Sequence, residues 1–449
     1  NSAMADSVSI TAPSNVILYP CRDSAEMSVT WWDSATAASG QVVYGTDENL
    51  ADAKTVNATQ SATGDSANKY SAFEAKMTGL AAGTKYYYKV GHDNVWSKTN
   101  SFTTQPAAAS AFKFVFFGDV QSGYDNWAKL VSNAAGNNDL AFALTAGDMV
   151  NFDSSIYNWN EFLSAASKNF ASLPMLAVTG NHETIGTTGT PDYLQKFMAL
   201  PTNGPEGFDE RFYSYDYGNA HITVLDSNVF SGEENLTEEK LAEIKTWIKN
   251  DLAASNATWK IVAMHHPAYA VVSDSIAAKV MANWVDVFEE AQVDVVFCGH
   301  QHIYMRTYPM YKEKVNKHGI TYVMGNSGDK TYPKADVSYS AKMIENTPTY
   351  QLVSIDGDKM TLKTCIADGT VLDSVNITAH DRTVEIPDIK DVNGDIDGDG
   401  NVTADDYDTI IDAILNCTTN VFMDVNGDGK VNIADAHYIK NMLSTTVEN

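Results

Sequence analysis

Residues 293–302 read VDVVFCGHQH, an apolar run that turns at a glycine and ends in two histidines. A short apolar run bounded by glycine is typical of a strand that is buried on both faces. Four other apolar runs end in a similar manner, in Gly118-Asp119, Gly147-Asp148, Gly180-Asn181-His182-Glu183 and His265-His266-Pro267. Parallel strands end at one edge of their sheet, and ligands bind at that edge. The five endings therefore predict one site.

Each ending has an ordinary interpretation when it stands alone. Gly-Asp after a strand is usually a turn, and a single histidine in an apolar strand usually belongs to the core. Five such endings in chain order are hard to explain in this way. Their carboxylate, amide and imidazole groups, without a thiolate, suit Zn, Fe or Mn better than Ca or Mg. The pattern therefore predicts a transition-metal centre.

The pattern of apolar and polar residues changes along the 449-residue chain, which predicts a multidomain protein. Residues 1–10 are a predicted tail. Short strand-like stretches between Gly and Asp clusters predict an all-β sandwich over 11–105. Apolar runs that alternate with amphipathic helices predict an α/β domain over 111–380, with a sheet covered on both faces. A linker over 381–390 leads to a small α-helical domain over 391–449.

The formal net charge is −27, and the part from Glu385 onward carries 14 acidic and 3 basic side chains. This excess argues against broad binding of nucleic acid or anionic membranes. No apolar run approaches the roughly 18 residues that a membrane span needs. The first six residues lack the apolar core of a signal peptide.

Two acidic segments in the last domain repeat each other at an offset of 29 residues. Each follows the EF-hand-type calcium loop, with Gly at position 6, an acidic or amide residue at positions 1, 3 and 5, and Asp at position 12. An apolar-periodic helix follows each loop, which disfavours the alternative of a disordered acidic tail. Two Ca²⁺ ions are predicted. Their ligands are Asp395, Asp397, Asp399, Asn401 and Asp406 in the first loop, and Asp424, Asn426, Asp428, Lys430 and Asp435 in the second, with Asn401 and Lys430 offering only a carbonyl.

The five strand endings, taken in order, resemble those of the calcineurin-like metallophosphoesterases. Together with an N-terminal sandwich similar to fibronectin III, they are most similar to the purple acid phosphatase branch over roughly residues 11–380. The resemblance implies an α/β metallophosphoesterase sandwich with two metal ions, of Fe, Zn or Mn. The first ion would be held by Asp119, Asp148 and His302, and the second by Asp148, Asn181, His265 and His300.

The resemblance also implies an activity, the hydrolysis of phosphate esters by a hydroxide that bridges the two ions. Asp148 would take part as the bridging ligand, and His182 would assist the leaving oxygen. His266 would face the substrate or support a ligand. Four further residues near the motifs are assigned to ligand support or substrate contact, namely Asn151, Glu183, Tyr304 and Arg306. A catalytically degenerate metal-binding or carbohydrate-binding module is the alternative.

Two positions depart from the pattern of this family. Asn151 stands where purple acid phosphatases place a tyrosine, so the purple colour should be absent. Gln121 stands where other branches place a histidine, and its amide oxygen is the predicted replacement ligand; hydrogen bonding to a ligand or water is the alternative. The loop 271–275 lacks the phosphate-binding histidines of the plant enzymes, so substrate preference does not transfer.

The paired calcium loops resemble a type I dockerin. Dockerins attach enzymes to cohesin domains of a scaffold protein, as in cellulosomes. The resemblance implies a cohesin partner and a secreted protein, held outside the cell on such a scaffold. Loop positions 10 and 11 differ between the repeats (Ala404-Asp405 and Ile433-Ala434), which disfavours symmetric binding in two orientations.

Two other features leave alternatives open. Aromatic residues of the first domain could bind a glycan, although core packing is the favoured interpretation; they are Trp31, Trp32, Tyr86, Tyr87, Tyr88 and Trp96. The four cysteines, Cys21, Cys298, Cys365 and Cys417, are widely spaced and form no zinc cluster pattern. Cys298, inside an apolar run, is predicted to be buried.

Overall fold

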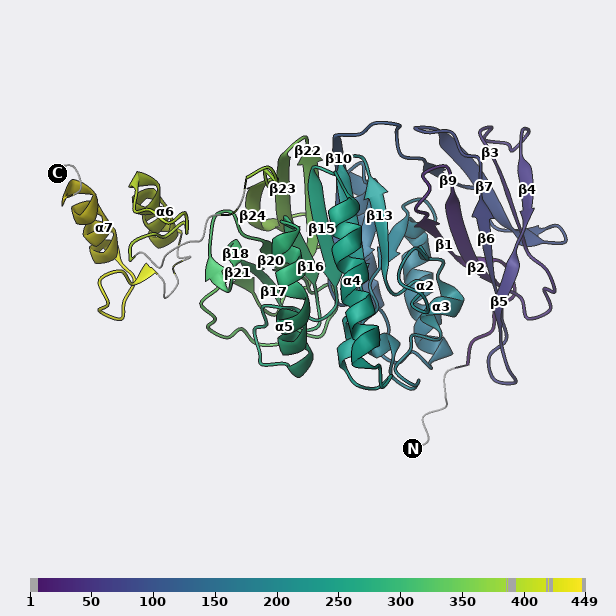
Figure 1. The fold of residues 1–449 in the computed structure, drawn as a ribbon. Coiled ribbons are helices and arrows are strands. Elements are labelled where there is room, and N and C mark those ends of the chain that lie inside the picture. Colours follow the sequence, from purple (N-terminus) through teal and green to yellow (C-terminus); the bar gives the residue numbers. More distant parts are fainter. Residues whose placement is uncertain (1–6, 385, 387–392, 417–418, 420–422, 446–449) are drawn as a thin grey trace.

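The computed structural model of the chain describes residues 7–384, 386, 393–416, 419 and 423–445. The three domains lie in a row, with the N-terminal β domain at one end, the α/β domain in the middle and the small helical domain at the other end (Figure 1). Half of the predicted linker over 381–390 (residues 385 and 387–390) and Cys417 lie outside the described residues. In the predicted tail, residues 8–10 belong to the first domain, where Ser9 pairs with Lys69 and Val8 is buried.

The first domain is a sandwich of two antiparallel sheets, as predicted. One sheet has the order β1-β2-β6-β5, formed by Ser14–Pro20, Met27–Asp33, Ser71–Met77 and Thr59–Thr63. The other has the order β4-β3-β7-β8, formed by Lys54–Asn57, Gln41–Gly45, Lys85–His92 and Val95–Trp96, with β9 (Asn100–Thr103) also paired to β7. Buried and half-buried side chains alternate along β7, which is expected of a strand with one face on a core.

The aromatic residues of this domain are mostly core residues. Trp31, Trp32 and Tyr88 are at most 1% exposed, and Tyr86 is also buried, so these four cannot stack on a glycan. Tyr87 and Trp96 are half-buried, and the ammonium groups of Lys85 and Lys89 lie over their rings. The glycan hypothesis is therefore wrong for the four buried residues, because their faces supply the apolar surface that holds the sandwich together.

The middle domain contains two sheets rather than the single covered sheet that the apolar runs predicted. The first has the order β12-β11-β10-β22-β23-β24, formed by Met175–Ala177, Phe142–Thr145, Ala111–Phe117, Tyr350–Asp356, Lys359–Cys365 and Val371–Thr378. The second has the order β13-β14-β15-β16-β20-β17-β21, formed by Tyr213–Tyr217, Ala220–Leu225, Trp259–Met264, Val295–Cys298, Thr321–Met324, Tyr304–Thr307 and Ser340–Ile344.

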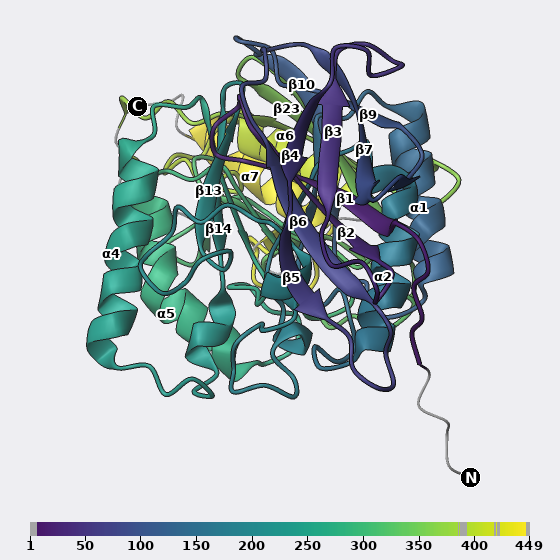
Figure 2. The same cartoon turned by 90° about the vertical axis from the view of Figure 1, so that its right-hand side faces the viewer.

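Four layers result, because each sheet has helices on its outer face and the other sheet on its inner face. Figure 2 shows α1 (Tyr124–Asn137) and α2 (Ile156–Phe170) on one side, and α4 (Glu238–Ala254) and α5 (Ser275–Glu290) on the other. The inner layer is aromatic: the Phe297 ring lies 4.7 Å from the Phe116 ring across the two sheets. The strands β11, β15 and β16 are buried along their whole length, which explains their continuous apolar runs. Cys298 is buried here, as predicted.

Short elements complete the described part of the domain. They are η1 (Asn181–Glu183), α3 (Leu194–Phe197), η2 (Ser227–Phe230), β18 (Met310–Tyr311) and β19 (Lys314–Val315). The described cysteines, Cys21, Cys298 and Cys365, are free. No helix among the described residues has the length and apolar character needed to cross a membrane.

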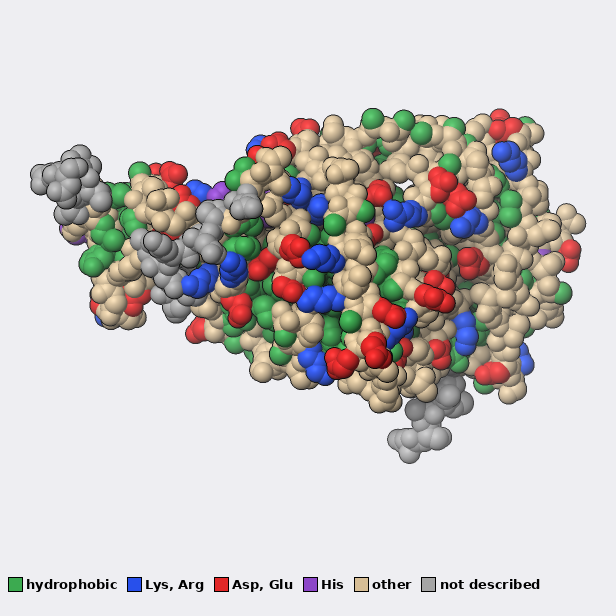
Figure 3. Space-filling view, viewed as in Figure 1, with side chains coloured by type: hydrophobic (Ala, Val, Ile, Leu, Met, Phe, Trp, Pro, Cys, Tyr) green, Lys and Arg blue, Asp and Glu red, His purple; other side chains and the backbone are tan. Residues whose placement is uncertain are grey.

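The outer face of α4 and α5 carries acidic and basic side chains side by side (Figure 3). Lys245 Nζ lies 2.7 Å from Asp286 Oδ2, and Lys249 Nζ lies 2.8 Å from Glu290 Oε1. Exposed pairs of this kind contribute about 0–1 kcal/mol each. They link the two helices and give this face no single sign of charge.

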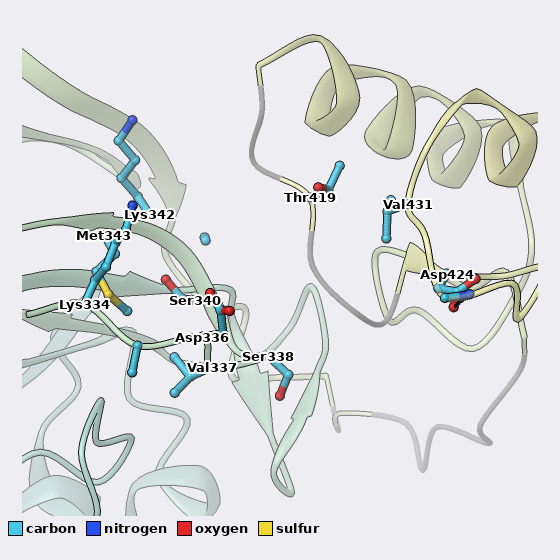
Figure 4. Close-up of a pocket in the computed structure, with 13 residues that line it drawn as sticks. Lys334, Asp336, Val337, Ser338, Ser340, Lys342, Met343, Thr419, Asp424 and Val431 are labelled. Atoms are coloured by element: carbon cyan, nitrogen blue, oxygen red, sulfur yellow. Dashed lines mark hydrogen bonds between the residues drawn. The ribbon is translucent and has the colours of Figure 1, made fainter.

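The last domain consists of α6 (Ala404–Leu415) and α7 (Ile433–Thr445), which pack on each other through Ile410, Ala436 and Ile439. The first acidic loop lies against the middle domain, where Lys317 Nζ is 2.7 Å from Asp399 Oδ2. A polar pocket of about 650 Å³ lies between the segment 334–343 and this domain (Figure 4). Its lining includes none of the strand-end residues, so it is separate from the site described next.

Candidate metal centre

The predicted strand-end residues meet at one edge of the middle domain. Asp119, Asp148 and Asn181 follow β10, β11 and β12 of one sheet, whereas His265 and His300 follow β15 and β16 of the other. The two sheets converge there, because Asp119 pairs with Asn326 beyond the end of β20. A Cβ atom added at Gly118 would lie 2.0 Å from the backbone of Gly325, so only glycine permits this approach.

The first cluster consists of Asp119, Asp148 and His302, all buried. Each offers one ligand atom, and the three atoms lie within 4.8 Å of one another. His302 Nε2 is 3.5 Å from Asp119 Oδ2, too far for a good hydrogen bond. Two atoms that each lie about 2.1 Å from a shared ion are separated by such a distance. The three side chains therefore fit one metal ion.

The second cluster lies next to the first and shares Asp148 with it. Asn181 Oδ1 is 2.9 Å from His265 Nε2 and 3.1 Å from His300 Nδ1. His265 Nε2 also lies 3.3 Å from Asp148 Oδ1. Four donors thus face one point, and the Asp148 carboxylate stands between the two clusters. This arrangement fits two neighbouring ions bridged by Asp148.

The backbone around the ligands is unusual. Asp148, His300 and His302 have φ angles of 49°, 72° and 46°, in the left-handed region that side chains other than glycine rarely adopt. Each such residue costs of order 1–3 kcal/mol and persists only where the surroundings enforce it. A Cβ atom added at Gly299 would lie 1.9 Å from Asp119 Oδ1. The strain and the close contacts turn the ligands inward at the strand ends.

Glu183 connects two of the loops that carry ligands, the loop after β11 and the loop after β12. Its carboxylate is fully buried and accepts hydrogen bonds from the backbone N–H groups of Asp148, Met149 and Gly180 at 2.8 Å each. Burial and, to a smaller extent, the charge of Asp148 raise the pKa of Glu183 to about 8. The prediction that Glu183 supports the ligands agrees with these contacts, which tie the loop after β11 to the loop after β12.

The charges of the centre are coupled. Burial raises the pKa of Asp119 to about 7. Burial would also raise the pKa of Asp148, but the charge of His265 lowers it below its usual value. Burial lowers the pKa of His302 to about 3, and the charge of Lys330 adds to this effect. Cations bound among these groups would keep the carboxylates ionised and the imidazoles neutral, as metal ligands must be.

Comparisons with known proteins agree with this geometry. Residues 112–304 match the calcineurin-like phosphoesterase family, and residues 13–104 match the purple acid phosphatase N-terminal domain. The middle domain is a calcineurin-like phosphoesterase domain. Residues 393–444 match the dockerin type I domain.

Several curated relatives match more than half of the chain. An uncharacterized protein of Mycobacterium tuberculosis (strain H37Rv) is 24% identical over 325 residues, which cover 64% of this chain and 60% of the relative. Purple acid phosphatase 21 of Arabidopsis thaliana is 26% identical over 316 residues, 68% of this chain and 69% of the relative. The chain thus spans about 60% of the length of the mycobacterial relative.

Solved structures support the same fold. The purple acid phosphatase PPD1 from seeds of yellow lupin (Lupinus luteus) has a TM-score of 0.66 at 21% identity, covering 83% of this chain and 75% of the lupin chain. A structure of PhoD has a TM-score of 0.60 at 14% identity, covering 82% of this chain and 89% of the other. At these identities the likeness concerns the fold alone.

Gln121 of the phosphoesterase domain lies at the rim of the first cluster. Its amide nitrogen lies 2.9 Å from Asn151 Oδ1 and 2.9 Å from His182 Nε2, and its Oε1 accepts a hydrogen bond of 3.2 Å from Lys330. The role of Gln121 as a metal ligand stays a prediction. The contacts of Gln121 in the structure are those of the alternative interpretation, in which it forms hydrogen bonds beside the centre. Asn151 joins Gln121 to His182, because its carbonyl oxygen is 2.7 Å from His182 Nδ1.

His266 lies beside the second cluster. It is buried, its ring centroid is 4.3 Å from that of His300, and its Nδ1 is 2.7 Å from Ser227 Oγ. Burial lowers the pKa of His266 well below its usual value, and the charge of His265 adds to the lowering. A neutral imidazole held by Ser227 suits the predicted role beside a ligand.

Tyr304 and Arg306 are not brought to the candidate metal centre. The Tyr304 hydroxyl donates to Asp373 Oδ2 at 2.8 Å, and Arg306 Nε donates to the same oxygen at 2.8 Å. Both side chains lie on β17 and join it to β24 of the opposite sheet. Their contacts therefore stabilise the sandwich, and their nearness to His302 in sequence does not place them at the metals.

Asp274 is a supporting residue that the sequence analysis missed. Its Oδ2 lies 3.2 Å from His300 Nε2, while its Oδ1 caps α5 by accepting from Ala277 N at 2.7 Å. His300 presents its other nitrogen to the second cluster. The hydrogen bond with His300 lowers the pKa of Asp274. A carboxylate behind a ligand imidazole fixes its tautomer and raises its basicity. An Asp directly before a helical period is a capping signal, but it did not reveal the partner.

Replacing Asp274 by asparagine should weaken the second metal site. Asparagine caps helices as well as aspartate, so α5 should keep its start, whereas the carboxylate behind His300 is lost. We expect affinity for the more weakly held ion to fall about 10- to 100-fold, measured by metal titration. Thr237→Ala, which removes the cap of α4, is the control and should leave metal affinity unchanged. Equal metal affinity in Asp274→Asn and the unmodified protein would contradict the role.

The two dockerin loops have closely similar hydrogen bonding. In the first, Asp395 Oδ2 accepts from Gly400 N at 2.7 Å, and Asp406 Oδ1 accepts from Ile396 N at 2.6 Å. In the second, Asp424 Oδ2 accepts from Gly429 N at 2.8 Å, and Asp435 Oδ1 accepts from Asn426 N at 3.2 Å. Asp395, Asp397 and Asp399 also offer ligand atoms within 4.8 Å of one another. Clustered carboxylates on a tight glycine turn fit a hard cation such as Ca²⁺.

Proposed function

We propose that the protein is a secreted phosphoesterase that hydrolyses phosphate esters at a dinuclear metal centre and attaches to a cohesin-bearing scaffold through its dockerin. The observation that carries the catalytic part is the pair of ligand clusters that share Asp148. The family of the middle domain supports a metal-dependent phosphoric ester hydrolase, and the dockerin supports a cohesin partner outside the cell. Fe, Zn or Mn are the proposed catalytic metals, and Ca²⁺ is proposed for the dockerin loops.

The ligands would hold two cations side by side, Asp119, Asp148 and His302 around one, and Asp148, Asn181, His265 and His300 around the other. When bound, such a pair neutralises the phosphate oxygens and lowers the pKa of water at the centre. Burial of the ligands excludes bulk water, which strengthens each electrostatic contact with the phosphate.

His182 is the residue placed to serve the leaving oxygen. Its Nδ1 donates to the Asn151 carbonyl oxygen, which leaves Nε2 as the nitrogen that gains or loses a proton. Nε2 lies 3.9 Å from Asp148 Oδ2, at the open side of the first cluster. A protonated Nε2 can therefore stabilise and protonate the departing alkoxide, and Gln121 Nε2 can donate to the same nitrogen after the proton has left.

Metal dependence tests this proposal. The chain freed of transition metals should not hydrolyse p-nitrophenyl phosphate, and addition of Mn²⁺, Zn²⁺ or Fe should restore hydrolysis, because no side chain of the centre is placed as a nucleophile. Ca²⁺ alone should not restore it, since imidazole ligands disfavour this ion. Metal content is measured alongside the rate. A protein that carries two ions per chain but hydrolyses no ester of a broad panel would support the degenerate alternative.

A further inference from the structure

We propose that Lys330 binds the substrate's phosphate group and makes this enzyme prefer phosphate monoesters to diesters. The inference rests on the proposed function and extends it to the class of ester. Lys330 follows β20, on the loop that faces the first ligand cluster. The purple acid phosphatase-like motifs do not include it.

The position of the Lys330 ammonium is defined by Gln121. Lys330 Nζ donates a hydrogen bond of 3.2 Å to Gln121 Oε1. The amide nitrogen of the same Gln121 lies 2.9 Å from His182 Nε2, the nitrogen assigned to the leaving oxygen. The Gln121 side chain alone therefore connects the ammonium to the place where the ester bond would break. The ammonium lies on the side of the first cluster, Asp119, Asp148 and His302.

The loop that carries Lys330 is fixed to the backbone of two metal-ligand residues. Ser327 N donates to the Asp119 carbonyl oxygen at 3.0 Å, and Tyr332 N donates to the His302 carbonyl oxygen at 3.1 Å. Between them, the Asn326 side chain donates to the Lys330 carbonyl oxygen at 3.0 Å. The lysine is thus attached to a rigid frame at the first cluster, as precise positioning of a charge requires.

The Lys330 ammonium forms no direct ion pair with a described carboxylate, although its charge acts on the buried carboxylate of Asp119. Among the described residues, none has a carboxylate oxygen within ion-pair distance of Lys330 Nζ; the contacts given for the ammonium are Gln121 Oε1 and the ring of Tyr332, at 5.3 Å. Neighbouring Asp329 is engaged elsewhere, since its Oδ1 accepts from Asn126 Nδ2 at 3.1 Å. A half-buried ammonium without a direct ion pair, beside a phosphoesterase centre, is suited to an anionic ligand.

A groove leads away from this ammonium and offers room for the leaving group. It has a volume of about 1140 Å³, and its lining includes Gln121, Asn151 and Lys330, which lie beside the metal centre, but none of the metal ligands. Tyr124, Asn158 and Glu161 line it further along α1 and α2. Its walls are polar, so it suits a hydrophilic leaving group. An ester whose phosphate lies beside Lys330 could therefore extend its leaving group along this groove.

The number of charges on the phosphate then decides the preference. Near neutral pH a monoester carries close to two negative charges, and a diester carries one. An additional fixed cation interacts with the second charge of the monoester, which the diester lacks. A hydrogen bond to a charged group contributes about 1.5–3 kcal/mol, or about 10- to 100-fold in binding. Lys330 should therefore favour monoesters by roughly this factor.

The test compares Lys330→Met and Lys330→Arg with the unmodified full-length protein loaded with the same metal. Two substrates are used, p-nitrophenyl phosphate and bis(p-nitrophenyl) phosphate, and binding of inorganic phosphate is measured by calorimetry. Lys334→Met is the matched control, because Lys334 is exposed on the same loop and lies outside the groove. Metal content confirms equal loading of every variant.

We expect Lys330→Met to lower kcat/KM for the monoester about 10- to 100-fold, to change that for the diester less than about threefold, and to weaken phosphate binding by a similar 10- to 100-fold. Lys330→Arg should recover most of the loss, and Lys334→Met should match the unmodified protein. An equal fall for both esters, or unchanged phosphate binding, would overturn the inference. If the unmodified protein hydrolyses neither ester, the proposed function fails, whereas phosphate binding still decides the role of Lys330.

Discussion

Asp148→Ala should abolish hydrolysis, with kcat/KM for p-nitrophenyl phosphate falling at least about a thousandfold. Asp148 is the one carboxylate that stands in both ligand clusters, with Oδ1 3.3 Å from His265 Nε2. Its loss removes a ligand from each ion at once. It also leaves His265, which is fully buried, without its negative partner. Steady-state kinetics and metal content, measured on the same preparation, check this expectation.

The fold should survive the substitution. Asp148 follows β11, and the hydrogen bonds that the backbone N–H groups of its loop donate to Glu183 do not use the Asp148 side chain. Circular dichroism should therefore match that of the unmodified protein. Asp358→Ala is the control, because it removes an exposed carboxylate that belongs to neither ligand cluster. This variant should keep full activity. Turnover near the unmodified level in Asp148→Ala with both ions bound would mean that the site is wrongly assigned.

The meeting of the predicted side chains at one edge could be foreseen from the sequence, because they obey a simple rule. Asp119, Asp148, Asn181, His265 and His300 each follow an apolar run, and the carboxyl ends of parallel strands share an edge. The rule required no knowledge of how many sheets there are. It would also have pointed to β20, whose apolar residues lead into Gly325-Asn326, and so to the loop that carries Lys330. That sixth ending was overlooked because it holds no carboxylate or imidazole.

Other features depend on contacts between segments that the local pattern does not encode. A strand covered by another sheet and a strand covered by helices on both faces have the same apolar sequence, so the four-layered arrangement was not predictable from periodicity. Tyr304 and Arg306 follow His302 closely, but β17 carries them to Asp373. Asp274 reaches His300 from a loop 26 residues earlier. Proximity in sequence to His302 was therefore misleading for Tyr304 and Arg306, whereas Asp274 has no such proximity to His300.

Asp406→Ala combined with Asp435→Ala should unfold the dockerin and abolish capture by its cohesin, while hydrolysis remains unchanged. Each carboxylate is fully buried at position 12 of its loop and accepts backbone N–H groups from the loop start, so each closes a calcium site onto its helix. The small core around Ile410 and Ile439 is too limited to hold two helices without the ions. If folding becomes unfavourable by about 4 kcal/mol, the apparent affinity falls about a thousandfold.

Asp412→Ala, an exposed change on α6, is the control. Surface plasmon resonance against immobilised cohesins, in excess Ca²⁺, measures the loss, and an affinity that survives the double substitution would show that cohesin binding needs neither calcium loop.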